Sequence, residues 1–213
     1  MKKIGAQMLP EIIAFFENWL AVSTEGAAPL AELLTHLHDL GEPRAIKPVM
    51  LPIVQSWFGQ ASQLPTAPHC ASLLSVLITA VEQLRWIPFA ADYLGEQFAD
   101  GFAYVQLIGP AVDGEEVAIF PSDNIAVGFS LQAPSLFYPP HYHQAIEFYG
   151  VLAGTARWQL GHQPPAWRPS GTRIFHDSDV AHAMATDVEP MLTIWAWLGD
   201  LESPIIIPAW DWL

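Results

Sequence analysis

The sequence predicts a mainly β-sheet protein, a barrel or sandwich, that carries an α-helical layer at its N-terminus. In the first hundred residues, apolar side chains recur at the three- and four-residue spacing of amphipathic helices. After Gly101 the pattern changes to short segments rich in Val, Ile, Phe and Trp, with turn residues at the spacing of roughly 8–12 residues typical of barrels and sandwiches. We therefore expect a helical extension over residues 1–100 and a β domain over residues 101–213.

Five helices are expected in the extension. Pro10 suits the first turn of a helix, so we place the start of the first one there. Glycine and proline punctuate the gaps between the apolar stripes. The expected helices cover residues 10–20, 30–37, 48–60, 73–84 and 90–98.

Seven strands are expected in the β domain, because each segment is short, rich in β-branched or aromatic residues and bounded by Gly, Pro, Asp or Asn. Their sequences are AYVQLIG, EVAIF, NIAVGFSL, AIEFYGVL, ARWQL, TRIFH and MLTIWAWL.

Charge and composition exclude several classes of partner. The net charge is −14, which repels the phosphates of nucleic acids and anionic membrane surfaces. No apolar run reaches the roughly 20 residues of a membrane span, and Glu11 and Glu17 interrupt the N-terminal run that resembles a signal peptide. We expect a cytoplasmic protein whose single cysteine, Cys70, belongs to a helix core.

The stretch YPPHYHQAIEFYGVLAG, residues 138–154, concentrates the residue types that bind metals. Side chains alternate between the two faces of a strand, so one strand through this region would point His141, His143, Glu147 and Tyr149 the same way. Two imidazoles and a carboxylate on one face suit a divalent transition metal ion such as Fe, Zn, Mn, Co or Ni. A polar strand facing solvent is the alternative, and the strongly apolar flanks disfavour it.

The other histidines are weaker candidates. His36 and His38 lie two residues apart on an expected helix, which places them on nearly opposite faces. His69 and His162 stand alone in the sequence, whereas His176 lies close to His182, which is discussed next.

The spacing H-x-H-x(3)-E-x(6)-G, which ends at Gly154, resembles the first signature of the cupins, small β-barrels that bind a metal in the barrel mouth. A second cupin signature normally supplies another histidine from a neighbouring strand. The segment PSGTRIFHDSDVAHAMAT offers His176 and His182 for this role, but Ile174 occupies the position where that signature has its histidine.

A narrower resemblance is to the cupin-type dimethylsulfoniopropionate (DMSP) lyases, which carry a helical extension before the barrel. The matching residues are Tyr138, Pro140, His141, His143, Glu147, Tyr149 and, in the segment HAMAT, His182. This resemblance implies one divalent metal ion bound by His141, His143, Glu147 and His182, with His176 left out. It also implies a small-molecule substrate, DMSP, that is cleaved to acrylate and dimethyl sulfide.

That reaction is a β-elimination and needs a base for the proton next to the carboxylate. Tyr149 is the candidate general base, because a nearby cation favours phenolate, and Tyr138 is the second candidate or a substrate-positioning group. Aromatic faces suit the sulfonium cation, so Trp197 and Phe129 are expected to contact it. Trp158 and Trp195 are further aromatic candidates, and core packing explains most of these aromatic residues equally well.

Other functions use the same ligands. An iron-dependent dioxygenase, an isomerase or lyase of another small carboxylate, and a non-catalytic binding cupin all remain alternatives, because fold and ligand set do not fix the reaction. The acidic N-terminal half lacks a basic helix-turn-helix pattern, which argues against a transcription factor. A monomer or a homodimer is expected.

Overall fold

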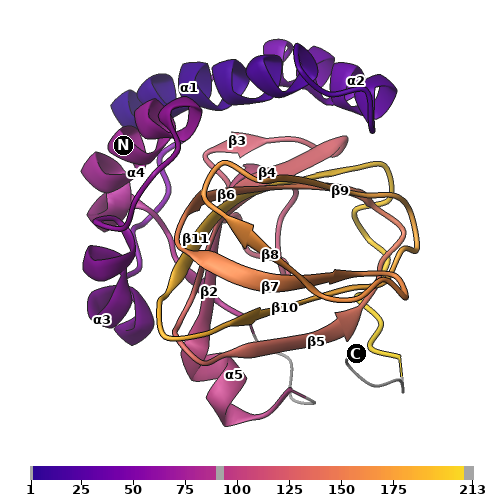
Figure 1. Cartoon of the computed structure of the whole chain (residues 1–213). Helices are drawn as coiled ribbons and strands as arrows, with labels where there is room; N and C mark the ends of the chain where they lie inside the picture. The colour runs from indigo at the N-terminus through magenta and orange to yellow at the C-terminus, as the bar shows by residue number, and fades with distance from the viewer. Residues whose placement is uncertain (1, 90–93, 209–213) are drawn as a thin grey trace.

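The computed structural model describes residues 2–89 and 94–208 as helices layered over one side of a two-sheet β-barrel (Figure 1). The expected helical extension and barrel are both present. The helices are α1 (Lys2–Leu20), α2 (Ala27–His38), α3 (Pro52–Ala61), α4 (Ala71–Ala80) and α5 (Glu96–Gly101), with 3₁₀ turns η1 (Pro68–Cys70) and η2 (Val81–Gln83).

The first helix begins eight residues before Pro10, so the expected start at that proline is wrong. A proline inside a helix removes one backbone hydrogen bond. Ile4 and Met8 lie before the proline and are buried in the core, and the burial of these side chains offsets the loss. The second to fourth helices form where their stripes predict them. Of the segment expected as a fifth helix, residues 90–93 lie outside the described residues and α5 occupies 96–101.

Two sheets form the barrel. In the described residues, seven strands make a sheet in the order β1-β2-β4-β11-β6-β9, with β3 paired to β2, and four strands make the second sheet in the order β5-β10-β7-β8. The bounds are β1 (Ile87–Pro88), β2 (Phe102–Gly109), β3 (Phe120–Pro121), β4 (Ile125–Gln132), β5 (Phe137–His141), β6 (Ile146–Ala153), β7 (Thr155–Leu160), β8 (Ala166–Pro169), β9 (Arg173–His176), β10 (His182–Thr186) and β11 (Met191–Leu198).

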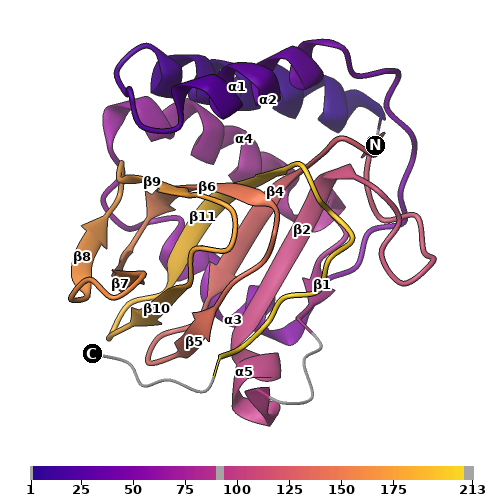
Figure 2. The same cartoon turned by 90° about the vertical axis from the view of Figure 1, so that its right-hand side faces the viewer.

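The helices cover the outer face of the larger sheet, and the smaller sheet lies on the far side of the barrel (Figure 2). Along β6, Phe148 points outward, and the centroid of its ring lies 5.5 Å from that of Trp19 on α1. Glu147 and Tyr149 therefore point inward, to the space between the sheets. One core thus lies beneath the helices and a second one, rich in aromatic residues, lies inside the barrel.

Six of the seven expected strands form nearly as predicted, but EVAIF contributes only Phe120 to a two-residue strand. Four strands were not predicted, namely β1, β5, β8 and β10. The last three belong to the smaller sheet, and β1 is a two-residue strand at the edge of the larger one. Among the described residues, none of the helices combines the length and the apolar character needed to cross a membrane.

Candidate metal centre

The residues of the central motif meet inside the barrel, but they do not come from one strand. The chain leaves β5 at His141 and enters β6 only at Ile146. Between them, the backbone of Tyr142 pairs with that of Ile206 near the C-terminus. The predicted single strand is therefore wrong: His141 ends a strand of the smaller sheet, His143 lies in a connection, and Glu147 belongs to the larger sheet.

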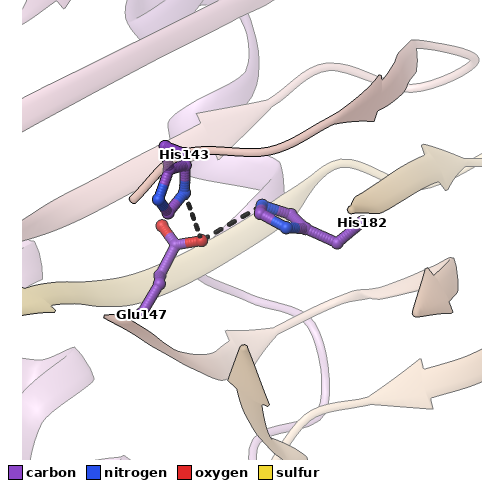
Figure 3. Close-up of side chains that lie close together, drawn as sticks. All are labelled: His143, Glu147 and His182. Atoms are coloured by element: carbon purple, nitrogen blue, oxygen red, sulfur yellow. Dashed lines mark hydrogen bonds and ion pairs between the residues drawn. The ribbon is translucent and has the colours of Figure 1, made fainter. Parts of the chain in front are cut away.

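His143, Glu147 and His182 form a group whose ligand atoms all lie within 4.8 Å of one another (Figure 3). All three side chains are buried. The Oε2 atom of Glu147 lies 3.3 Å from Nε2 of His143 and 3.1 Å from Nε2 of His182. The larger sheet thus supplies the carboxylate of Glu147. The smaller sheet supplies the imidazole of His182, and the connection between β5 and β6 supplies that of His143.

Backbone carbonyl groups select one tautomer of each predicted histidine ligand. The Nδ1 atoms of His141, His143 and His182 lie 2.8, 2.9 and 3.0 Å from the carbonyl oxygens of Pro139, Ala145 and Val180, respectively. A carbonyl oxygen only accepts, so each Nδ1 carries the proton and donates it. The lone pair of each neutral ring is then on Nε2, the state that coordinates a metal ion.

The group fits a divalent metal ion. Nε2 of His182 is buried and has no hydrogen-bond partner of suitable geometry. A buried lone pair without a partner costs free energy, and binding of a metal ion would remove that cost. Two imidazole nitrogens and a carboxylate oxygen are a donor set that Zn²⁺, Fe²⁺ and similar ions accept. His141 lies outside this group, although its ring contacts that of His182 at 4.1 Å.

Electrostatics favour an ionised carboxylate at the centre. Burial alone would raise the pKa of Glu147, but the charge of protonated His143 and the hydrogen bonds from His143 and His176 hold it well below its usual value. Burial lowers the pKa of His143, yet the nearby charge and hydrogen bond of Glu147 outweigh this effect and raise it. For His141, burial and the charge of His182 lower the pKa well below its usual value.

His176, which the resemblance leaves out of the ligand set, is nevertheless at the site. Its Nδ1 lies 2.9 Å from Oε2 of Glu147, and its ring stacks on that of His182 at 3.8 Å. Burial and the charge of His182 lower the pKa of His176 to about 3. The sequence signal for His176 was its place close to His182, in the segment that resembles the second cupin signature.

A cavity of about 220 Å³ opens beside the metal-binding group, and tyrosine, tryptophan and phenylalanine side chains form a large part of its lining. Of the predicted site residues, it is lined by Tyr138, His141, His143, Glu147, Tyr149 and Trp197. Its other aromatic residues are Phe89, Phe102, Tyr104 and Trp195. Among the lining residues that the structure describes, none is lysine or arginine.

Phe129 does not reach this cavity, so the predicted substrate contact is wrong. Its side chain is fully buried in the core beneath the helices, on the outer face of β4. Its neighbours on β4, Ala126 and Ser130, line the cavity from the other face. Trp197 does line the cavity, and its indole Nε1 also donates a hydrogen bond of 2.6 Å to Oε1 of Glu147.

The two tyrosines differ in their surroundings. The ring of Tyr138 stacks on that of His141 at 3.8 Å. Burial and the charges of Glu147 and Tyr138 raise the pKa of Tyr149 well above its usual value. The protein alone therefore keeps Tyr149 protonated, and a phenolate at this position needs a compensating positive charge.

Comparisons with known proteins agree with this fold and identify the family. A family model described as dimethylsulfoniopropionate lyase matches residues 21–193. The DMSP lyase DddQ of Ruegeria pomeroyi is 30% identical over 195 residues, which are 90% of this chain and 93% of the relative. The putative DMSP lyase DddL of Cereibacter sphaeroides is 26% identical over 75% of this chain and 63% of the relative.

The crystal structure of DddQ from Ruegeria pomeroyi matches with a TM-score of 0.70 at 29% identity, covering 92% of this chain and 98% of that chain. A chain from the crystal structures of the DMSP lyases RdDddP and RnDddQII shares the fold, with a TM-score of 0.70 at 22% identity. The model match and the 30% identical relative both span most of the sequence. This chain therefore belongs to the DMSP lyase family, whose members are carbon–sulfur lyases.

Proposed function

We propose that this protein is a metal-dependent lyase that cleaves DMSP by β-elimination to acrylate and dimethyl sulfide. The observation that carries the proposal is the buried His143, Glu147 and His182 group beside an aromatic cavity. Membership of the DMSP lyase family supports the choice of substrate.

The substrate carboxylate needs a positive partner, and the described cavity lining provides no lysine or arginine for it. His143, Glu147 and His182 would hold the metal ion, with His141 as the predicted fourth ligand. When bound, a divalent ion such as Fe, Zn, Mn, Co or Ni supplies Lewis acidity that stabilises the negative charge developing beside the carboxylate.

Tyr149 is the proposed general base, which accepts the α-proton at its phenolic oxygen. It lines the cavity two residues after Glu147 on the inner face of β6. Burial and then the charge of Glu147 raise the pKa of Tyr149, and a bound cation would offset that charge. Tyr138, whose ring stacks on His141, is proposed to position the substrate.

The sulfonium end of the substrate is proposed to lie against the aromatic part of the cavity. Aromatic faces attract cations by about 0.5–2 kcal/mol each, more when water is excluded. Trp197 remains a proposed contact, and its hydrogen bond to Glu147 fixes its indole ring beside the metal-binding group. This arrangement would place the sulfonium among the aromatic side chains and the substrate carboxylate at the metal-binding group.

The test is the release of dimethyl sulfide into the headspace when purified protein is incubated with DMSP, with and without a chelator. We expect release that the chelator abolishes and that added divalent metal restores, in the absence of O₂. Oxygen consumption would indicate a dioxygenase instead. Stoichiometric binding of DMSP without turnover, by folded and metal-loaded protein, would contradict a lyase.

The sequence-based expectations of a cytoplasmic location, a monomer or homodimer, no nucleic-acid partner, and a boundary at residue 100 between the extension and the barrel stay predictions.

A further inference from the structure

We propose that His176 is a positioning residue that orients the carboxylate of Glu147, and that Trp158 in turn orients His176. This inference rests on the proposed metal site and assigns a role to two residues outside its ligand set. It is carried by a chain of hydrogen bonds that links the two sheets behind the ligands.

The first step is the register of the larger sheet. Glu147 on β6 lies directly opposite Trp197 on β11 and His176 on β9. Directly opposite residues of antiparallel strands point to the same face, so the three side chains form one row across the sheet. Both carboxylate oxygens are held within this row: Oε1 accepts from Trp197 at 2.6 Å, and Oε2 lies 2.9 Å from Nδ1 of His176.

The second step is the direction of each hydrogen bond. The indole N–H of Trp158 lies 3.1 Å from Nε2 of His176. An indole nitrogen only donates, so Nε2 of His176 must accept. The ring proton of His176 is therefore on Nδ1, and it points at Oε2 of Glu147. His176 then has no free lone pair for a metal ion, because Nδ1 carries the proton and the lone pair on Nε2 already accepts from Trp158.

The third step is contact with a second residue of the group. The ring of His176 stacks on that of His182 at 3.8 Å with an angle of 15° between the planes. His176 thus limits the rotation of both Glu147 and His182. Groups that orient metal ligands in this way typically contribute about 10–100-fold to metal affinity or activity. His176 and Trp158 are themselves nearly inaccessible to solvent, so water does not replace either one.

The experiment compares His176→Leu with His176→Asn by titrating chelator-treated protein with Co²⁺ and recording its visible absorption. Leucine fills the space but cannot donate, whereas the asparagine amide can donate to Glu147 from a place near that of Nδ1. We expect His176→Leu to weaken Co²⁺ binding by about 10–100-fold and to change the spectrum. His176→Asn should recover most of the affinity and the wild-type spectrum.

Two further variants complete the design. Trp158→Phe removes only the donor to His176, and it should weaken Co²⁺ binding less than His176→Leu does; it also carries the test if the leucine variant does not fold. His38→Asn changes an exposed histidine on α2 and should leave Co²⁺ binding unchanged. Urea unfolding of every variant identifies any that lose affinity through loss of structure.

Wild-type affinity in both His176→Leu and Trp158→Phe would overturn the inference. So would a folded His176→Asn variant as weak as His176→Leu, because His176 would then act as a ligand rather than through Glu147. Failure of the proposed metal site is distinguishable, since the wild-type protein itself would then give no Co²⁺ spectrum.

Discussion

At the scale of single residues, three histidine side chains converge on one atom, Oε2 of Glu147. It lies within 3.3 Å of imidazole nitrogens from His143, His176 and His182, and each comes from a different part of the chain. Charge-assisted contacts of this kind keep the carboxylate ionised despite its burial. A buried carboxylate that accepts from His176 and faces the metal-binding nitrogens of His143 and His182 is a site that a cation completes.

Tyr149→Phe is the decisive variant at the residue scale. The substitution removes the phenolic oxygen that is proposed to accept the proton, and it leaves His143, Glu147 and His182 in place. We expect wild-type Co²⁺ affinity and a loss of at least about 100-fold in kcat for dimethyl sulfide release, the usual contribution of a general base.

Tyr142→Phe is the matched control, because Tyr142 lies next to His143 in sequence but does not line the described cavity. It should keep near wild-type activity. Equal kcat in Tyr149→Phe and the wild type would show that another group removes the proton, with Tyr138 as the next candidate.

At the scale of elements, the segment after β11 forms part of the site. Leu201 and Ile205 line the cavity, and the backbone of Ile206 exchanges two hydrogen bonds of 2.9 and 2.8 Å with Tyr142. The yellow segment can be followed in Figure 2, where it runs in front of the barrel strands after β11. We call residues 199–208 the C-terminal strap. It ties the cavity wall to the connection that carries His143.

Ile206→Pro tests the strap, because proline lacks the N–H that donates to Tyr142. We expect a several-fold higher KM for DMSP, since the cavity wall loosens, with little change in Co²⁺ affinity. Ile206→Ala keeps the N–H and shortens a half-exposed side chain, so its KM should stay close to that of the wild type. Equal KM values in the two variants would show that the strap does not shape the cavity.

The sequence predicted the strands of the larger sheet better than those of the smaller one, for a physical reason. The larger sheet is apolar on both faces, as in β4, where every residue is buried, so its strands stand out in composition. In contrast, β5 contains two prolines, β8 is a four-residue edge strand, and β10 is formed by HAMAT. These strands depend on partners distant in the chain, which local patterns do not reveal.

The same limit explains the results at the site. The motif predicted which residue types gather, but the break after His141 depends on the distant pairing with Ile206. Phe129 was misplaced because a strand buried on both faces gives no signal of which face meets the helices. His176 and Trp158 could not be joined from sequence, since they belong to different sheets.

At the scale of the whole molecule, the barrel holds several titratable groups away from water. His141, His143, Glu147, His176 and His182 are all buried between the two sheets. The helical layer stabilises this arrangement from outside, because Trp19 packs on Phe148, the residue between Glu147 and Tyr149. The stability of the metal-free fold should therefore depend on pH through these groups.

Metal-free protein is expected to lose stability as the pH falls from about 6.5 to 5, the range in which histidines of the unfolded chain bind protons. Burial depresses the pKa of His141, and that of His176 to about 3, so both stay neutral in the fold. As the pH falls, the unfolded state therefore binds more protons than the folded state. Each of these two histidines then lowers the free energy of unfolding by up to about 1.4 kcal/mol per pH unit. His143, whose pKa is raised, acts oppositely, since its contribution is lost as the pH rises. The depressed pKa of Glu147 adds a further loss below about pH 4.

Urea unfolding of chelated protein at pH 7 and pH 5 measures the difference, and His176→Asn should make the pH dependence shallower. Equal or greater stability at pH 5 in the wild type would mean that the buried histidines take up protons without leaving the fold.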